Sequence, residues 1–235
     1  MGKPGFQGMV RDGEITITNY TGAAKVVEIP ESVIGLPIVA IGDEVFNNKG
    51  LTRITIPDIV TRIGDFAFAN NQLTSIAIPD SVSRIGNSAF ANNQLTSVTI
   101  PDSVIWIGVS VFANNQLTKV VIGNGVKFIN KEAFANNHLT EVTIGNSVKT
   151  IGYHAFYKNK LTEITIPDNV ETICDFAFNG NPPFKPIITN LKFLDGHAFS
   201  NDYDETLKTY KDGEQSGMYT EENVEWNKEE KTISF

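Results

Sequence analysis

The sequence contains very little cysteine, a deficit of positive charge and no long apolar run. Its 235 residues include a single cysteine, which excludes an internal disulfide framework and a multi-thiolate metal site. Lysine and arginine number 19 against 27 aspartates and glutamates, for a net charge of −8. Nucleic acid is therefore not an expected partner, because phosphate binding needs a concentrated basic surface. No stretch reaches the roughly 18 apolar residues of a membrane helix, so no transmembrane segment is predicted.

What the chain does contain is a 22-residue repeat. Six consecutive units, over residues 51–182, fit the pattern L-T-x-[IV]-x-I-[PG]-[DN]-x-V-x-x-I-x-x-x-[AV]-F-x-x-N-x. The units begin at Leu51, Leu73, Leu95, Leu117, Leu139 and Leu161. An irregular unit lengthened by an insertion precedes them from residue 24, and a decayed unit follows. Self-similarity of this length predicts a solenoid, in which one coil cannot bury its apolar face until a neighbour stacks on it.

Each unit reads as a short strand followed by two bends. In the first regular unit Ile54 and Ile56 alternate with polar residues, the period of a strand with one buried face. Pro57 follows and ends the strand, because proline cannot donate to a ladder. The Ala67–Phe68 corner is too short for a full helix and favours a single turn of 3₁₀ or α type.

Two columns of residues are expected to hold the coils together. A stacked aromatic spine is predicted for Phe68, Phe90, Phe112, Phe134, Phe156 and Phe178. A ladder of amides that satisfies the backbone of neighbouring coils is predicted for Asn71, Asn93, Asn115, Asn137, Asn159 and Asn181. The second prediction follows from the rule that buried polar groups are paired.

The repeat resembles the BspA-type leucine-rich repeat of bacterial surface proteins. Residues 73–90 match L-T-x-[IV]-x-I-P-x-x-V-x-x-I-G-x-x-A-F almost perfectly, and residues 13–22, 27–30 and 35–37 resemble that family's N-terminal cap and first repeat. The resemblance implies a repeat solenoid: a right-handed leucine-rich-repeat coil with a parallel β-sheet face and short 3₁₀ or α turns opposite it. We expect an N-terminal β cap over residues 1–23, the solenoid over 24–202, and a capping β-hairpin over 203–235, since an uncapped array exposes a sheet edge.

The resemblance also implies recognition rather than catalysis. BspA-like proteins are typically secreted or displayed on the cell surface, and several are associated with adhesion. The expected partner is a protein, either of the host extracellular matrix or of another bacterial surface. A structural scaffold that assembles into a homo-oligomer is the alternative. The first residues lack the apolar run of a secretory signal, so either the chain is cytosolic or, for the expected extracellular or cell-surface location, a signal segment has been removed.

No catalytic, cofactor or metal site is predicted. Cys174 occupies the column of Gly64 and Gly86, where a small residue suits a crowded bend. The three histidines fall in different columns and form no ligand cluster; they are His138, His154 and His197. A column of aspartates offers oxygen ligands that suit calcium, but its place after the strand-ending proline is explained by turn formation. Its members are Asp58, Asp80, Asp102 and Asp168.

Two surfaces are candidates for binding a protein. In one column Trp106 and Phe128 follow Arg62 and Arg84, with Ile105 alongside. Large aromatic residues at variable outward positions suit a binding surface, since tryptophan, tyrosine and arginine are enriched at energetic hot spots. The alternative is that both rings fold down over the edge of the solenoid. The second candidate is the outward face of the strands, the concave side, represented by Thr99, Val121 and Lys119.

Overall fold

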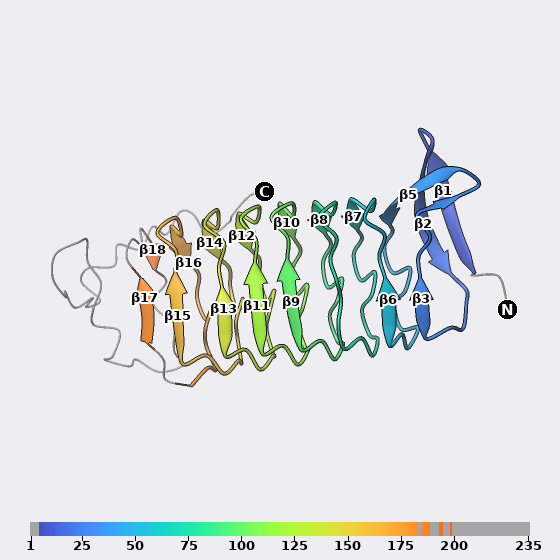
Figure 1. Ribbon diagram of the computed structural model, residues 1–235. Coiled ribbons are helices and arrows are strands. Elements are labelled where there is room, and N and C mark those ends of the chain that lie inside the picture. Colours follow the sequence, from blue (N-terminus) through green and yellow to red (C-terminus); the bar gives the residue numbers. More distant parts are fainter. Residues whose placement is uncertain (1–4, 183–184, 189–192, 195–197, 199–235) are drawn as a thin grey trace.

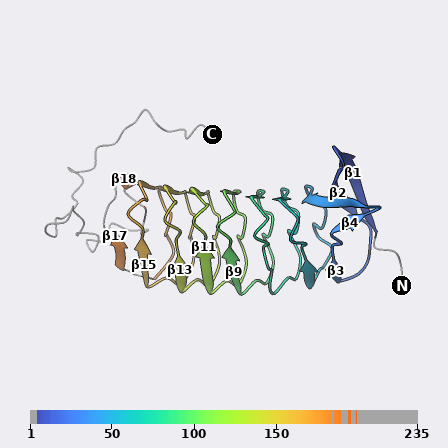
Figure 2. The ribbon, with the colours of Figure 1, turned by 45° about the horizontal axis from the view of Figure 1, so that its top comes forward.

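The computed structural model describes residues 5–182, 185–188, 193–194 and 198, and it is a parallel β-solenoid (Figure 1). The coils stack side by side in a nearly straight line, which the turned view also shows (Figure 2). No helix is present in the described part of the chain. The predicted solenoid is therefore confirmed, and its coils enclose one continuous apolar core.

Two rows of strands run along the solenoid, whereas the sequence pattern predicts one. The first row consists of β3 (Val26–Glu28), β6 (Arg53–Thr55), β9 (Ser97–Ile100), β11 (Lys119–Ile122), β13 (Glu141–Thr143), β15 (Glu163–Ile166) and β17 (Lys185–Ile188). The second row consists of β5 (Leu36–Ile41), β7 (Arg62–Ile63), β8 (Arg84–Ile85), β10 (Trp106–Ile107), β12 (Phe128–Ile129), β14 (Thr150–Ile151), β16 (Thr172–Ile173) and β18 (Phe193–Leu194). Strands of the second row are too short to show an alternating pattern, because most of them hold one outward and one buried residue.

Successive coils lie in register, so residues one period apart are neighbours in space. In the first row Lys119 pairs with Ser97 on one side and with Glu141 on the other, in parallel ladders. In the second row Trp106 pairs with Arg84. The coil that begins at Leu73 forms no strand over residues 75–78, although its side chains keep the alternation of burial.

The predicted phenylalanine spine is confirmed and begins one coil earlier than expected. The rings of the spine, which are those of Phe46 and the six predicted phenylalanines, are fully buried. They are nearly parallel, and neighbouring ring centroids lie 5.2–5.6 Å apart. At its N-terminal end the spine is covered by Tyr20, whose ring centroid lies 5.2 Å from that of Phe46, and by Phe6. The dispersion contacts of each ring therefore come mainly from the coils on either side.

The predicted asparagine ladder is also confirmed. Asn115, which is buried, accepts a hydrogen bond from the backbone N–H of Leu95 at 3.0 Å and donates to the carbonyl oxygens of Phe90 and Phe112 at 3.0 and 3.1 Å. Phe90 belongs to the preceding coil, whereas Leu95 opens the coil that contains Asn115 and Phe112. One amide side chain therefore satisfies backbone groups of two coils that no strand ladder reaches.

The corner beside the phenylalanines differs from the expected helical turn. Only one bond there is local, from the N–H of Ala69 to the carbonyl of Phe66 at 3.1 Å. The N–H groups of Phe66, Phe68 and Asn70 instead donate to the next coil, at 2.8, 2.8 and 3.0 Å. Phe66 and Asn70 have positive φ angles of 53° and 57°, and left-handed residues interrupt a right-handed helix. The corner is thus a third ladder between coils.

At the N-terminal end an antiparallel hairpin stands on the solenoid (Figure 2). It consists of β1 (Phe6–Arg11) and β2 (Glu14–Tyr20), and β2 continues in parallel with β5. A two-residue strand, β4 (Ser32–Val33), folds back on β5 through the insertion in the first unit. The C-terminal hairpin expected over residues 203–235 lies outside the described residues.

Candidate functional site

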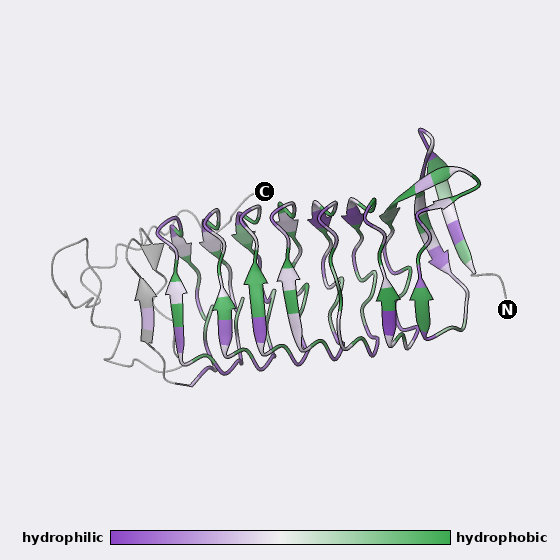
Figure 3. Ribbon diagram, in the orientation of Figure 1, coloured by the Kyte–Doolittle hydropathy of each residue, from purple (hydrophilic) through white to green (hydrophobic). Residues whose placement is uncertain are grey.

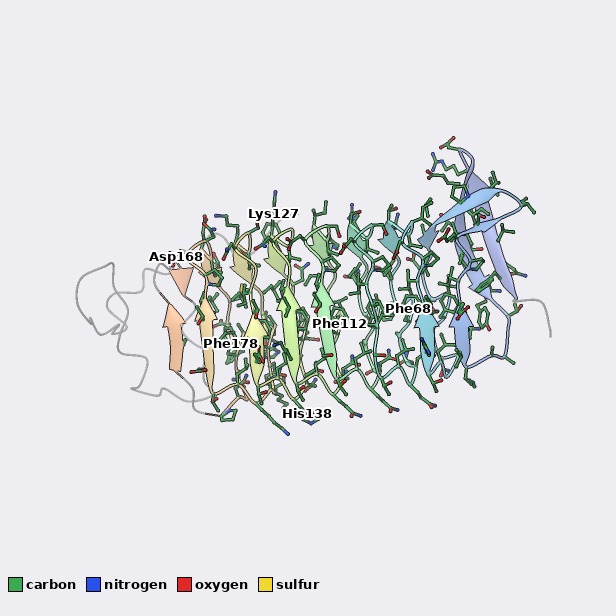
Figure 4. The ribbon with its side chains drawn as sticks, in the orientation of Figure 1. Phe68, Phe112, Lys127, His138, Asp168 and Phe178 are labelled. Atoms are coloured by element: carbon green, nitrogen blue, oxygen red, sulfur yellow. The ribbon has the colours of Figure 1, made fainter. Side chains whose placement is uncertain are left out.

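Six outward residues follow one another along the second row of strands. We call them the basic–aromatic rim: Arg62, Arg84, Ile105, Trp106, Lys127 and Phe128. The ladder places Arg84 beside both Arg62 and Trp106, and β10 contacts β12, which carries Phe128. Figure 3 shows the hydrophilic colour of the arginines on β7 and β8, and Figure 4 shows Lys127 at the edge of the solenoid, pointing away from the core.

The apolar centre of the rim is partly accessible to solvent. Ile105 exposes 57% of its surface, while Trp106 and Phe128 are half-buried. The guanidinium carbon of Arg84 lies 6.0 Å from the centre of the Trp106 ring, within the range of a cation–π attraction. The rings therefore lie against the rim and still present part of their area to the outside.

The three cations of the rim lack carboxylate partners within the described part of the chain. Arg62, Arg84 and Lys127 are exposed, and none takes part in the ion pairs formed by the described residues. One coil further along, Lys149 pairs with Glu171 at 3.2 Å. Positive charge is consequently concentrated over the first coils of the rim, on a chain whose net charge is −8.

The second predicted surface lies on the other row of strands and is separate from the rim. Thr99 is exposed and Val121 is half-buried on this face. Lys119 forms an ion pair with Glu141 on the next strand, with 2.5 Å between the ammonium nitrogen and a carboxylate oxygen. The structure thus divides the predicted residues between two faces, and on this face the lysine is neutralised by a neighbouring coil.

An aromatic cluster at the corner is absent from the sequence-based candidates. His154 stacks on Tyr157 with ring centroids 4.4 Å apart, and it lies 4.0 Å from Tyr153 and 5.7 Å from Phe176. Burial lowers the pKa of His154, against the raising effect of Glu132. The signal that could have revealed the cluster is the coincidence of three rings in one coil, at positions where the coil that begins at Leu95 carries Val109, Ser110 and Ala113.

No cluster of ionisable side chains suited to a metal occurs among residues 5–182 and the few described beyond them. In the aspartate column, a carboxylate oxygen of Asp102 accepts a bond from the backbone N–H of Asn124 at 2.6 Å. This aspartate therefore ties its turn to the next coil, where the sequence suggested a bond within its own turn. Cys174 is half-buried, and His138 lies at the edge opposite Lys127 (Figure 4). Among the described residues, no helix is long and apolar enough to span a membrane.

These features define a parallel β-solenoid protein built from leucine-rich coils. The family model for the BspA type leucine rich repeat region, with six copies, matches residues 39–160 and 107–214. The chain belongs to this family, as the repeat pattern predicted. No curated protein shows significant sequence similarity to the chain.

Two solved structures of bacterial proteins share the fold. One is a leucine rich cell surface protein from Faecalibacterium prausnitzii, with 30% identity and a TM-score of 0.69 over 82% of this chain and 54% of that one. The chain therefore spans about half the length of that protein. The other is the leucine rich repeat protein of T. pallidum, with 25% identity and a TM-score of 0.59 over 81% of this chain and 83% of that one.

Proposed function

We propose that this chain is a non-enzymatic protein-recognition module of a bacterial surface or secreted protein, and that the basic–aromatic rim is its contact surface. The observation that carries the proposal is the exposed Ile105 beside Trp106, with Phe128 on the adjoining strand. Support for a surface location comes from the family and from the description of the F. prausnitzii relative as a cell surface protein. Proteins of the host extracellular matrix and of other bacterial surfaces are the partners to test.

The rim suits recognition because it combines large rings with arginine on a rigid support. Aromatic and arginine side chains contribute most of the energy of typical interfaces, and losing one such anchor costs about 2 kcal/mol or more. Trp106 lies on β10 and Phe128 on β12, and each of these strands contacts the strands of the coils on both sides. Little ordering entropy is therefore lost when a partner binds.

Replacing Trp106 and Phe128 together with threonine should weaken binding to a protein partner by about 30-fold or more, as expected for the loss of anchor side chains. Threonine is the residue that the same column carries at Thr150 and Thr172, so the coil is expected to keep its fold. Surface plasmon resonance against a panel of purified extracellular-matrix and bacterial surface proteins measures the affinity, and circular dichroism checks the fold.

The matched control is Thr99→Ala on the first row of strands, where Ala77 occupies the same column. This variant should bind like the unmodified chain. Equal affinity of the unmodified chain and the double threonine variant for a bound partner would remove the rim from the proposal and leave the first-row face as the candidate.

A second candidate function is assembly of several copies, and a specific observation favours it. Met9 and Val10 on β1 expose 64% and 55% of their surfaces, and Ile34 in the β4–β5 hairpin exposes 88%. β1 also forms the end of its sheet, and a sheet edge is a template for pairing with another chain.

For assembly, light scattering over a hundredfold range of concentration should show a mass that rises with concentration, and Val10→Lys should abolish the rise, because charged residues at an edge oppose pairing. A constant monomer mass for the unmodified chain would eliminate assembly as its function.

A further inference from the structure

We infer that the partner of the basic–aromatic rim presents an acidic, extended peptide segment in which carboxylates flank apolar side chains. This inference rests on the proposed function and specifies the chemistry of the partner. It follows from what the rim carries: a row of cations that form no ion pair with the described residues, next to half-buried rings.

The charge of the rim stands out against its surroundings. The chain is acidic overall, and the ion pairs on the neighbouring coils neutralise Lys119 and Lys149. Arg62, Arg84 and Lys127 have no such partner among the described residues. The carboxylate of Asp65, three residues after Arg62 in the sequence, accepts bonds from the backbone and side-chain nitrogens of Asn87 at 2.8 and 3.0 Å and takes part in no ion pair of the described residues. The cations thus remain available to an incoming anion.

The chemistry of the cations favours carboxylates. The guanidinium group of arginine presents a planar set of donors that matches a carboxylate through two parallel hydrogen bonds. Arg62 and Arg84 are direct neighbours across the ladder, so two carboxylates close together on a partner would each meet one guanidinium. Complementary charge also raises the association rate of such a pair.

The rings between the cations favour a peptide over a sulfated polysaccharide. Ile105 and Trp106 lie in the coil between Arg84 and Lys127, Phe128 adjoins Lys127, and these three side chains offer an apolar surface. A polyanion without apolar groups would leave this surface unused, whereas leucine or proline side chains would cover it. Adjacent strands lie about 4.8 Å apart, so the three steps from Arg62 to Lys127 cover about 14 Å, the length of four or five extended residues.

The experiment uses the full chain with Trp226→Phe. The chain has two tryptophans, so this substitution leaves Trp106 as the single tryptophan and as the fluorescent reporter of the rim. The probe is a synthetic seven-residue peptide with two aspartates on each side of a Leu-Pro-Leu centre, where proline keeps the peptide extended. Titration should change the Trp106 emission saturably. Replacing the four aspartates with asparagine should weaken binding at least tenfold.

The double variant Arg62→Thr/Arg84→Thr, which again uses the residue of Thr150 and Thr172, should weaken binding of the acidic probe about tenfold at low salt. The difference should shrink at 1 M salt, where the screening length falls to about 3 Å from about 10 Å at 0.1 M. The matched control Arg53→Ser removes an arginine from the first row, where Ser75 and Ser97 occupy its column, and should leave the affinity unchanged.

Three results would overturn the inference. They are an equal loss in the Arg53→Ser control, equal binding of the aspartate and asparagine peptides, and tighter binding of dextran sulfate than of the peptide at matched charge. The inference can fail while the proposed function stands. If a partner protein loses affinity with the threonine variants of Trp106 and Phe128 but keeps it with those of Arg62 and Arg84, the rim is the recognition surface and its partner is not acidic.

Discussion

Replacing Phe112 with alanine should lower the free energy of unfolding by about 3–5 kcal/mol, the range for deleting a buried phenylalanine ring. Phe112 lies in the middle of the spine, and the rings of Phe90 and Phe134 stand 5.2 and 5.6 Å from its centre on either side. Both neighbours would lose the ring against which they pack. The cavity would open at the joint between coils, where collapse requires the backbones to move together. Urea unfolding followed by circular dichroism measures the change.

The control for Phe112 is an exposed phenylalanine at the same corner. Phe66 exposes 41% of its surface, and Ser88 and Ser110 occupy its column with φ angles of 51° and 53°. Phe66→Ser should therefore shift the free energy of unfolding by no more than about 0.5 kcal/mol, as is usual for surface sites. A loss in Phe112→Ala as small as in this control would mean that the stacked rings do not hold the coils together.

Replacing Asn115 with alanine should lower the free energy of unfolding by about 2–3 kcal/mol, although the side chain is small and polar. The substitution leaves the buried N–H of Leu95 without a partner. The carbonyls of Phe90 and Phe112 each lose one of two amide donors and keep the other, from Asn93 and Asn137. A buried backbone group without a hydrogen bond costs about 1–3 kcal/mol, and the two weakened carbonyl contacts add to that cost. Thermal and urea unfolding give the value.

Asn115→Asp separates the acceptor role from the donor role of this amide. The aspartate can still accept the bond from Leu95, but its ionised carboxylate would face the carbonyl oxygens to which the amide donates. Ionisation is thus disfavoured in the folded state, and the folded-state pKa of the new carboxyl should rise. Relative to the unmodified chain at each pH, the destabilisation should therefore be smaller in acid, where the protonated carboxyl donates one bond.

The neighbouring Gln116→Ala serves as the control for the ladder, because Gln116 is exposed and its backbone N–H, which the substitution keeps, donates to the carbonyl of Leu95. It should change the free energy of unfolding by less than about 0.5 kcal/mol. If Asn115→Ala behaves like this control, water or a local shift must satisfy the backbone groups that the amide serves.

The candidate rim could be predicted from the sequence only in part. The column that holds Arg62, Arg84, Trp106 and Phe128 follows from the repeat length alone, since in-register stacking makes neighbours of residues one period apart. The sequence does not show that the charge of Lys119 is cancelled by Glu141 while that of Lys127 is not. Ion pairs depend on side-chain conformations across two coils, which no spacing encodes.

The aromatic cluster around His154 was missed for a related reason. Tyr153, His154 and Tyr157 come from one coil and Phe176 from the next. A column holds the same position of successive coils, so it pairs His154 with Phe176 but gives no contact between His154 and Tyr157, which lie in different columns. Their meeting depends on the path of the backbone through that corner.

By itself the amino-acid sequence determined the coil length, the buried spine and the asparagine ladder, because each is a column of one residue type in a strict period. Only the tertiary structure decided the second row of strands and the ladder at the corner. A left-handed φ of 51–56° is common to Phe66, Ser88 and Glu132 at this corner, although their side chains differ in size and polarity. What Phe66, Ser88 and Glu132 share is a backbone N–H that donates to a carbonyl of the next coil. That geometry arises only when the coils are stacked.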